Sequence, residues 1–280
     1  MKLGVVGLGA MGAGIAQLGI EAGLETVGRE LDPARAEAAR GRIAHFLGRK
    51  VEKGQLEAAA RDAALARLTV TDDLADLGGC DVVIEAAFES LEVKHDLFRE
   101  LERVVRPGTI LATNTSALSV TEIASVLERP GRAVGMHFFN PAPLMPLVEI
   151  VRAERTEDDV VERAFELGAR LGKTPIRCSD TPGFVVNRVL IPLLNDCVRV
   201  LDEAGVTPED LDAGMTRGAG WPMGPCALLD LVGADVHVHA SEALYEKLRE
   251  PRFAPPPRLV RMLQAGKLGR KSGEGFYRYE

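Results

Sequence analysis

A histidine and a glutamate stand on opposite sides of a proline-rich segment, in a spacing that favours acid–base chemistry. His137 ends an apolar run, the segment 140–146 holds three prolines, and Glu149 lies inside the apolar run 147–151. Because proline fixes φ and ends regular pairing, we predict two short strands joined by a loop. A carboxylate is costly to bury alone, and an imidazole on the neighbouring strand is its obvious partner. The pair fits a general base for a hydroxyl proton, but it also fits a satisfied core histidine beside an unrelated edge glutamate.

The N-terminal glycines predict a turn that binds a dinucleotide. The spacing G-x-G-x-x-G follows an apolar run and precedes a helical stretch that reaches about Ala22. The first glycine permits a tight turn, the second lets a pyrophosphate approach the backbone, and the third allows close helix–strand packing. The helix N-terminus adds free N–H groups and a positive dipole end for phosphates. The predicted cofactor-binding residues of this turn are Gly7, Leu8, Gly9, Ala10, Met11 and Gly12.

An acidic residue at the end of the next predicted strand indicates which dinucleotide binds. Glu30 lies 18 positions after Gly12, where a carboxylate can accept hydrogen bonds from both hydroxyls of the adenosine ribose. It would also repel the 2′-phosphate of NADP, so we predict NAD. Arg29 could still meet a phosphate, and Asp32 could instead cap the helix after Pro33.

Polar residues follow two further predicted strands. Glu89 and Lys94 come after the buried run 81–87, while Asn114 and Ser116 close the run 109–116. Ligands bind at the carboxyl ends of strands in open parallel sheets, so we expect Glu89 and Lys94 to face the nicotinamide and its ribose. The alternative interpretation is an acid that favours a helix start and a surface lysine.

Ser116 and a nearby serine receive different interpretations. Ser119 and Glu122 form a capping box, which gives Ser119 a structural role. Ser116 is then left for ligand contact at the same sheet edge as His137.

The order of predicted elements indicates an α/β fold with two domains. We expect a doubly wound, Rossmann-type sheet in residues 1–182 and an all-helical domain in 183–280. A helical insertion occupies about 33–67, and Lys50 and Lys53 flank its turn, either as solvated lysines or as contacts for an anionic part of the substrate.

In the helical half, Asn187 lies in the first predicted turn, either as a buried hydrogen-bonding group or as a substrate contact. Its repeated Leu, Val and Ala faces predict a homodimer. The final segment 269–277 is either a flexible end or a docked one, with Lys271 available for a phosphate or carboxylate.

Bulk properties exclude several classes of protein. The net charge is −7, so no basic field for nucleic acid or polybasic membrane anchor is present, and we expect neither partner. No signal peptide or run of 18 apolar residues is found. The four cysteines are widely spaced, which favours a reducing, cytoplasmic location over disulfides or a metal site.

The chain resembles the 3-hydroxyacyl-CoA dehydrogenase family, including its bacterial 3-hydroxybutyryl-CoA members, essentially from end to end. The resemblance rests on GLGAMGAGIA, IEAAFESLEVK, ATNTSALSVTEIA, GMHFFNPAPLMPLVEIV, DTPGFVVNR, WPMGPCALLDLVG and GRKSGEGFY. It implies an N-terminal Rossmann domain, a C-terminal helical dimerisation domain and a reversible reaction. In that reaction NAD oxidises an L-(3S)-3-hydroxyacyl-CoA to the 3-ketoacyl-CoA, and no metal takes part.

The resemblance also implies roles for individual residues. It makes His137 the general base and Glu149 the carboxylate that orients it. The other implied roles are to hold the reacting oxygen (Ser116, Asn187), to bind the ribose (Glu30), to contact the cofactor (Glu89, Lys94, Asn140, Lys271) and to meet the CoA phosphates (Lys53). Two residues depart from the family pattern: Glu30 stands where Asp is commoner, and Trp221 stands where His is frequent. We interpret Trp221 as a packing residue.

Two other functions compete with this reading. A dehydrogenase of free hydroxy acids could share the two-domain build, but the 3-hydroxyisobutyrate type needs a lysine in its helical domain, and none lies between Lys173 and Lys247. A sugar-acid enzyme is harder to separate by sequence. A non-catalytic NAD-binding protein would not need the paired His137 and Glu149.

Overall fold

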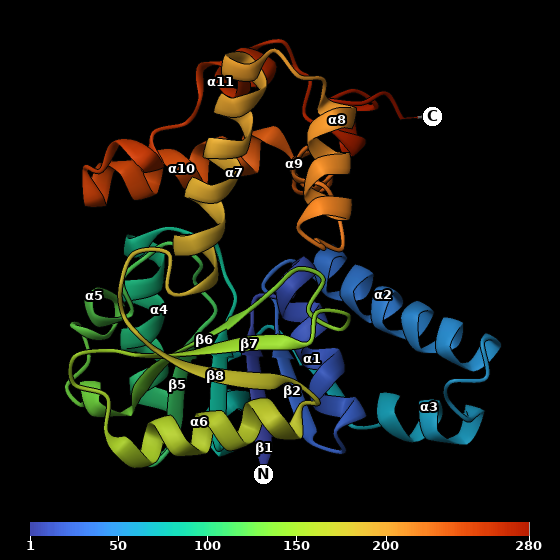
Figure 1. The fold of residues 1–280 in the computed structure, drawn as a ribbon. Coiled ribbons are helices and arrows are strands. Elements are labelled where there is room, and N and C mark those ends of the chain that lie inside the picture. Colours follow the sequence, from blue (N-terminus) through green and yellow to red (C-terminus); the bar gives the residue numbers. More distant parts are fainter. Residues whose placement is uncertain (280) are drawn as a thin grey trace. The chain divides into compact units, whose positions relative to one another are not determined.

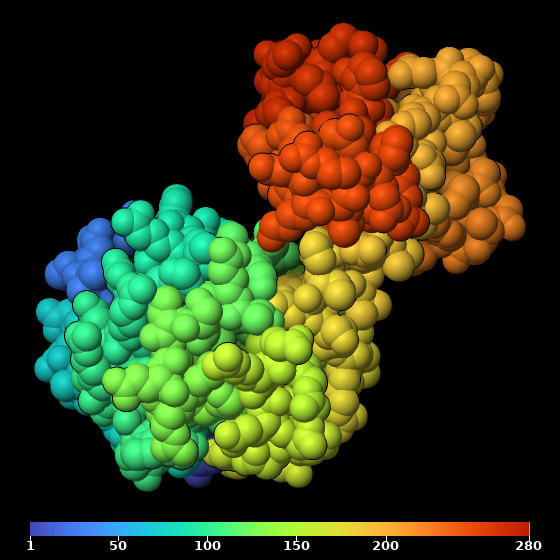
Figure 2. Space-filling view, turned by 90° about the vertical axis from the view of Figure 1, so that its left-hand side faces the viewer, coloured from blue at the N-terminus to red at the C-terminus, as the bar shows by residue number. Residues whose placement is uncertain are grey.

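A computed structural model describes residues 1–279. The chain forms two compact units and passes from one to the other between Thr181 and Pro182. Figure 2 shows the surface of the first unit in blue to yellow-green. Among the described residues, no helix is long and apolar enough to cross a membrane, and no group of His, Cys, Asp and Glu side chains is arranged to hold a metal ion.

The first unit is built on one sheet whose spatial order is β3-β2-β1-β4-β5-β6-β7-β8 (Figure 1). All neighbouring strands run parallel except β6 and β7, which are antiparallel. The strands are β1 (Lys2–Val6), β2 (Glu25–Arg29), β3 (Leu68–Thr71), β4 (Val82–Glu85), β5 (Ile110–Thr113), β6 (Ala133–Phe138), β7 (Leu147–Arg152) and β8 (Thr174–Ser179).

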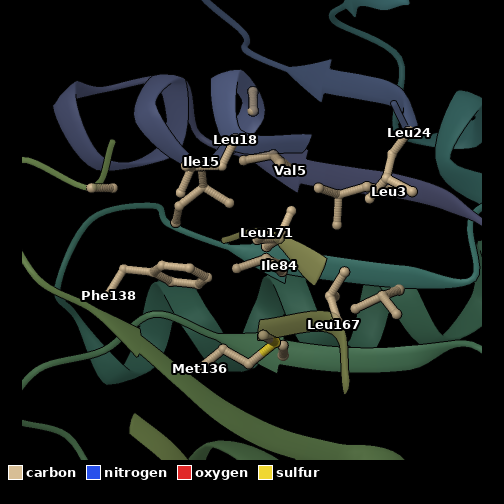
Figure 3. Packing of buried hydrophobic residues seen from close by; sticks show 14 of the residues in the cluster. Leu3, Val5, Ile15, Leu18, Leu24, Ile84, Met136, Phe138, Leu167 and Leu171 are labelled. Atoms are coloured by element: carbon tan, nitrogen blue, oxygen red, sulfur yellow. The ribbon is translucent and has the colours of Figure 1, made fainter. Parts of the chain in front are cut away.

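Helices cover both faces of this sheet because its strands are apolar on both sides. The helices of the first unit are α1 (Ala10–Glu21), α2 (Pro33–Glu52), α3 (Ala58–Leu65), α4 (Leu91–Val104), α5 (Val120–Ala124) and α6 (Asp158–Arg170). Successive residues of β4 point to opposite faces: Ile84 packs with α1 and α6, and Val83 with α4 and α5. Figure 3 shows Ile15, Leu18 and Leu167 converging on Ile84 from the first of these faces.

In the part that the structure describes, the second unit is mainly helical, with two isolated β-bridges in its C-terminal tail. Its helices are α7 (Val186–Ala204), α8 (Pro208–Ala213), α9 (Pro225–Val232), α10 (Ala234–Leu248) and α11 (Pro257–Gln264). Trp221 packs against the small core of Leu194, Val198 and Leu229. The predicted Rossmann-type sheet with a helical C-terminal region is therefore confirmed.

The glycine-rich tail docks on the second unit. Asp230 is 2% exposed and accepts hydrogen bonds from the backbone N–H groups of Phe276 and Tyr277 and from the Tyr279 hydroxyl, each 2.9 Å long. The Tyr277 hydroxyl donates to Asp212 over 2.8 Å. The flexible-end interpretation of 269–277 is wrong, because two carboxylates hold the tail's backbone and hydroxyl groups.

Candidate active site

The two strands on either side of the proline-rich segment place His137 directly opposite Glu149. These residues are cross-strand partners in the β6–β7 ladder, and His137 Nδ1 lies 2.6 Å from Glu149 Oε2. The histidine is 5% exposed and the glutamate is fully buried. The glutamate is therefore the partner of His137 and not an unrelated edge residue.

This contact sets the chemistry that the imidazole can perform. When Nδ1–H is donated to Glu149, a neutral ring carries its lone pair on Nε2, where it can take a proton. The buried carboxylate then stabilises the imidazolium that forms. The geometry fits a proton acceptor with a fixed orientation.

A lysine that the sequence analysis did not single out holds the loop after His137. Lys173 is 8% exposed, and its Nζ donates to the carbonyls of Ala142 (2.6 Å) and Met145 (2.9 Å). Burial lowers the pKa of this lysine. The same loop rests on α1, where a Cβ on Gly14 would lie 2.9 Å from the Pro143 ring. The loop is thus fixed from two sides.

The glycine-rich turn has the shape that a dinucleotide requires. Gly7 has φ +85°, and a Cβ on Gly12 would lie 1.7 Å from the Gly7 carbonyl oxygen. A Cβ on Gly9 would meet no atom within 4 Å, so space is open over the second glycine. Helix α1 starts without a side-chain cap or a first-turn acid. Its N–H groups are therefore available to donate hydrogen bonds to an anion.

The carboxylate of Glu30 is hydrogen-bonded to this turn. It accepts hydrogen bonds from the backbone N–H groups of Leu8 (3.0 Å) and Asp32 (3.3 Å). Asp32 caps α2 through the N–H groups of Ala34 and Arg35, which confirms that interpretation. The guanidinium of Arg29 donates to the carbonyl of Asp72, over 3.2 Å.

The polar residues after β4 and β5 do lie together. Glu89 accepts a hydrogen bond from the backbone N–H of the exposed Ser116, over 3.1 Å. Asn114 Oδ1 accepts from Phe138 N over 2.9 Å, which joins the end of β5 to the end of β6. Ser119 caps α5 by accepting from Glu122 N, which confirms its structural role.

The surface interpretation of Lys94 is wrong. Its side chain is 1% exposed, because it turns inward to the fully buried Glu85. Sequence reasoning overlooked Glu85, which reads as the last residue of an apolar strand. The available signal was an acid in an otherwise apolar run with a lysine nine positions later.

A cleft of about 620 Å³ opens between α1, α2 and the proline-rich loop. Its walls include two exposed apolar side chains, Phe46 and Leu144. Basic residues of α2 and its C-cap also line it, namely Arg42, Arg49, Lys50 and Lys53, together with Asn140 from the loop. Lys50 forms an ion pair with Glu21, whereas Lys53 is exposed.

Comparison with known proteins shows which family this chain belongs to. The profile of the 3-hydroxyacyl-CoA dehydrogenase NAD-binding domain matches residues 2–181, and that of the family's C-terminal domain matches 183–279. The chain belongs to the 3-hydroxyacyl-CoA dehydrogenase family.

Individual relatives match over the whole chain. A probable 3-hydroxybutyryl-CoA dehydrogenase of Deinococcus radiodurans is 43% identical over 279 residues and covers 100% of both chains. The crystal structure of Mycobacterium tuberculosis FadB2 is 44% identical with a TM-score of 0.95, covering 100% of this chain and 99% of that one. The structure of (S)-3-hydroxybutyryl-CoA dehydrogenase PaaH1 from Ralstonia eutropha is 39% identical with a TM-score of 0.96 and the same coverage.

The predicted family and cofactor are therefore confirmed: the chain is an NAD-dependent 3-hydroxyacyl-CoA dehydrogenase. The open space at Gly9 and the uncapped α1 fit the pyrophosphate of NAD.

Two predicted site residues of this 3-hydroxyacyl-CoA dehydrogenase lie in its second unit. Asn187 is in the first turn of α7 and is half-buried, so it is not a fully buried core group, and its contact with the substrate stays a prediction. The fully buried asparagine of α7 is Asn195, two turns later, where helix periodicity returns to the same face. Lys271 is exposed and donates to Asp235 of α10 over 2.7 Å.

Proposed function

We propose that this enzyme interconverts short-chain L-3-hydroxyacyl-CoA and 3-ketoacyl-CoA esters, such as 3-hydroxybutyryl-CoA and acetoacetyl-CoA, with His137 as the general base. The observation that carries the proposal is the buried contact of 2.6 Å between His137 and Glu149. The short acyl chain is inferred from the names of the relatives described above, which are 3-hydroxybutyryl-CoA dehydrogenases.

In the oxidation direction, Nε2 of His137 takes the proton of the 3-hydroxyl group. Glu149 keeps the ring in place through Nδ1 and stabilises the imidazolium, which is an interaction made in the transition state and not in substrate binding. Ser116 and Asn187 donate hydrogen bonds to the reacting oxygen. NAD, when bound, supplies the acceptor for the hydride that leaves C3.

The remaining contacts follow from charge and position. Acyl-CoA occupies the cleft along α2, with its phosphates near Lys50 and Lys53 and its apolar parts against Phe46 and Leu144. Glu30 binds the adenosine ribose and Glu89 the nicotinamide side of the cofactor. Further cofactor contacts are proposed for Asn114, Asn140 and Lys271.

The working form is proposed to be a cytoplasmic homodimer that pairs through the second unit. Val189, Leu193 and Val200 of α7 recur on one helix face and are 63%, 38% and 42% exposed. A second copy of the chain would cover such an apolar stripe.

The test is steady-state oxidation of NADH with acetoacetyl-CoA near pH 7, in wild type and His137→Ala. We expect wild type to turn over and the variant to lose about 10²- to 10⁴-fold in kcat while it still binds NADH. His237→Gln, which alters a buried histidine of the second unit, serves as the matched control.

Other results point elsewhere. Turnover of free hydroxy acids with none of CoA esters would favour a free-acid dehydrogenase on the same fold. Binding of NADH without turnover of any of these compounds would leave a non-catalytic role.

A further inference from the structure

A buried ion cluster adjoins the stretch that carries Ser116. It consists of Glu85 at the end of β4, Lys94 in α4 and Glu89 in the loop between these elements. The side chains of Glu85 and Lys94 are 0% and 1% exposed, whereas that of Glu89 is 40% exposed. Buried ion pairs often contribute little net stability. Such a cluster at a reaction site therefore calls for a role other than stability.

The lysine bridges the two carboxylates. Lys94 Nζ lies 2.7 and 2.9 Å from the two carboxylate oxygens of Glu85 and 3.2 Å from Glu89 Oε2. These three contacts use the three N–H donors of the ammonium group. Lys94 therefore connects the fully buried Glu85 to the half-exposed Glu89.

Glu85 is itself hydrogen-bonded to the sheet and to the backbone that follows β4. Glu85 Oε2 accepts a hydrogen bond from the Thr113 hydroxyl of β5, over 2.7 Å. Its Oε1 accepts from the backbone N–H of Ala87, over 2.6 Å. Because β4 and β5 are central strands, Glu85 cannot shift without disturbing the sheet.

At the other end, the half-exposed acid holds the stretch 115–117. Glu89 Oε1 accepts hydrogen bonds from the Thr115 hydroxyl (2.5 Å), Ser116 N (3.1 Å) and Ala117 N (3.3 Å). Burial raises the pKa of Glu89, but Lys94 and these hydrogen bonds together hold it below its ordinary value. The acid thus stays ionised and keeps accepting all three donors.

We propose that Glu85 is a positioning residue, which fixes Glu89 through Lys94 and thereby sets the place of Ser116. The inference rests on the proposed role of Ser116 in holding the reacting oxygen. It assigns Lys94 the role of a bridge between the two acids. Proper placement matters because an error of about 1 Å in a reacting group can cost about a hundredfold in rate.

The test compares Glu85→Gln, Lys94→Met and the double variant with a matched control, Glu102→Gln. Glu102 also lies in the first unit, 3.1 Å from Arg132, with 14% of its side chain exposed. Five quantities are measured: kcat and KM with acetoacetyl-CoA, Kd for NADH, Tm, and hydrogen–deuterium exchange of the amides of 115–117 without cofactor.

We expect Glu85→Gln to lower kcat by about 10- to 100-fold and to speed exchange at 115–117 by about tenfold. The double variant loses no more than the worse single variant, because the residues act as one unit. The Glu102→Gln variant lowers Tm without changing kcat or this exchange. If Glu85→Gln does not fold, Lys94→Met, which removes the bridge between the two acids, should show the same changes in kcat and exchange.

Unchanged exchange at 115–117 in Glu85→Gln overturns the proposal, whatever happens to kcat. Losses of kcat in Glu85→Gln and Lys94→Met that add fully in the double variant also overturn it, because the two residues would then act separately. The exchange measurement needs no substrate, so a wild type inactive on acetoacetyl-CoA would refute the proposed function and still leave the positioning role tested.

Discussion

Two histidines of this chain are almost equally buried, and only their partners differ. His137 is 5% exposed and faces the carboxylate of Glu149, whereas His237 is 3% exposed and its Nε2 lies 2.9 Å from the amide oxygen of Asn195. Burial lowers the pKa of His237 to about 4, since a neutral amide does not favour the charged ring. Burial alone therefore does not identify a base, and the proposed role of His137 rests on its charged partner.

The neighbours of His237 indicate the role of its hydrogen-bond network. The Asn195 amide donates to the Ser241 hydroxyl (2.8 Å) and to the Arg252 carbonyl (3.2 Å). Ser241 in turn donates to the Phe253 carbonyl, over 2.7 Å. This network is neutral and ends on backbone carbonyls between α10 and α11, so its role is to hold that connection.

The largest effect should come from neutralising the partner of the first histidine. In Glu149→Gln the ring loses the charge that stabilises its protonated form. We expect kcat to fall about 10²-fold or more with little change in KM, because the interaction is made in the transition state. Steady-state kinetics beside His237→Gln checks this, and the control should keep wild-type kcat. A Glu149→Gln enzyme with a normal kcat would mean that the carboxylate only packs.

A smaller effect should be a loss of stability of the second unit at acidic pH. Below pH 6.5 the unfolded chain protonates His237, while the folded protein resists protonation until about pH 4. Protons then bind preferentially to the unfolded state, so stability falls as the pH decreases through this window. For His237 we expect a loss of about 2 kcal/mol in unfolding free energy between pH 7 and 5.

Urea unfolding followed by the fluorescence of Trp221, the one tryptophan in the sequence, measures this loss. The difference between wild type and His237→Gln should shrink by that amount as the pH drops. A difference that stays constant with pH would show that His237 is not held neutral by burial.

The smallest effect concerns the tail. In Tyr277→Phe the hydroxyl that donates to Asp212 is lost, but this carboxylate keeps the backbone donors of Cys226 and Ala227. We expect the unfolding free energy to fall by about 1 kcal/mol, with kcat unchanged. Thermal unfolding beside Tyr245→Phe, a change at a half-exposed tyrosine of α10, measures it. Equal losses in both variants would mean that the tail contact adds nothing.

The sequence predicts the strands and the principal pair well, because proline positions and apolar runs are local signals. His137 and Glu149 could be matched since one loop joins their strands. The bridge from Glu85 to Lys94 could not be predicted, because the direction of a helix lysine depends on tertiary contacts. The same limit applies in α7, because helix periodicity alone does not distinguish the half-buried Asn187 from the fully buried Asn195.

Glu30 has a consequence for anyone wishing to redesign the coenzyme preference. The usual approach replaces such an acid with a small neutral residue to admit a ribose phosphate. Here the same carboxylate also receives the N–H of Leu8, inside the glycine-rich turn. Replacing Glu30 would remove this hydrogen bond within the turn along with the charge that we propose excludes NADP, so an exchange at this single position would weaken the binding of either coenzyme. A second change that restores an acceptor for the Leu8 amide belongs in any such design.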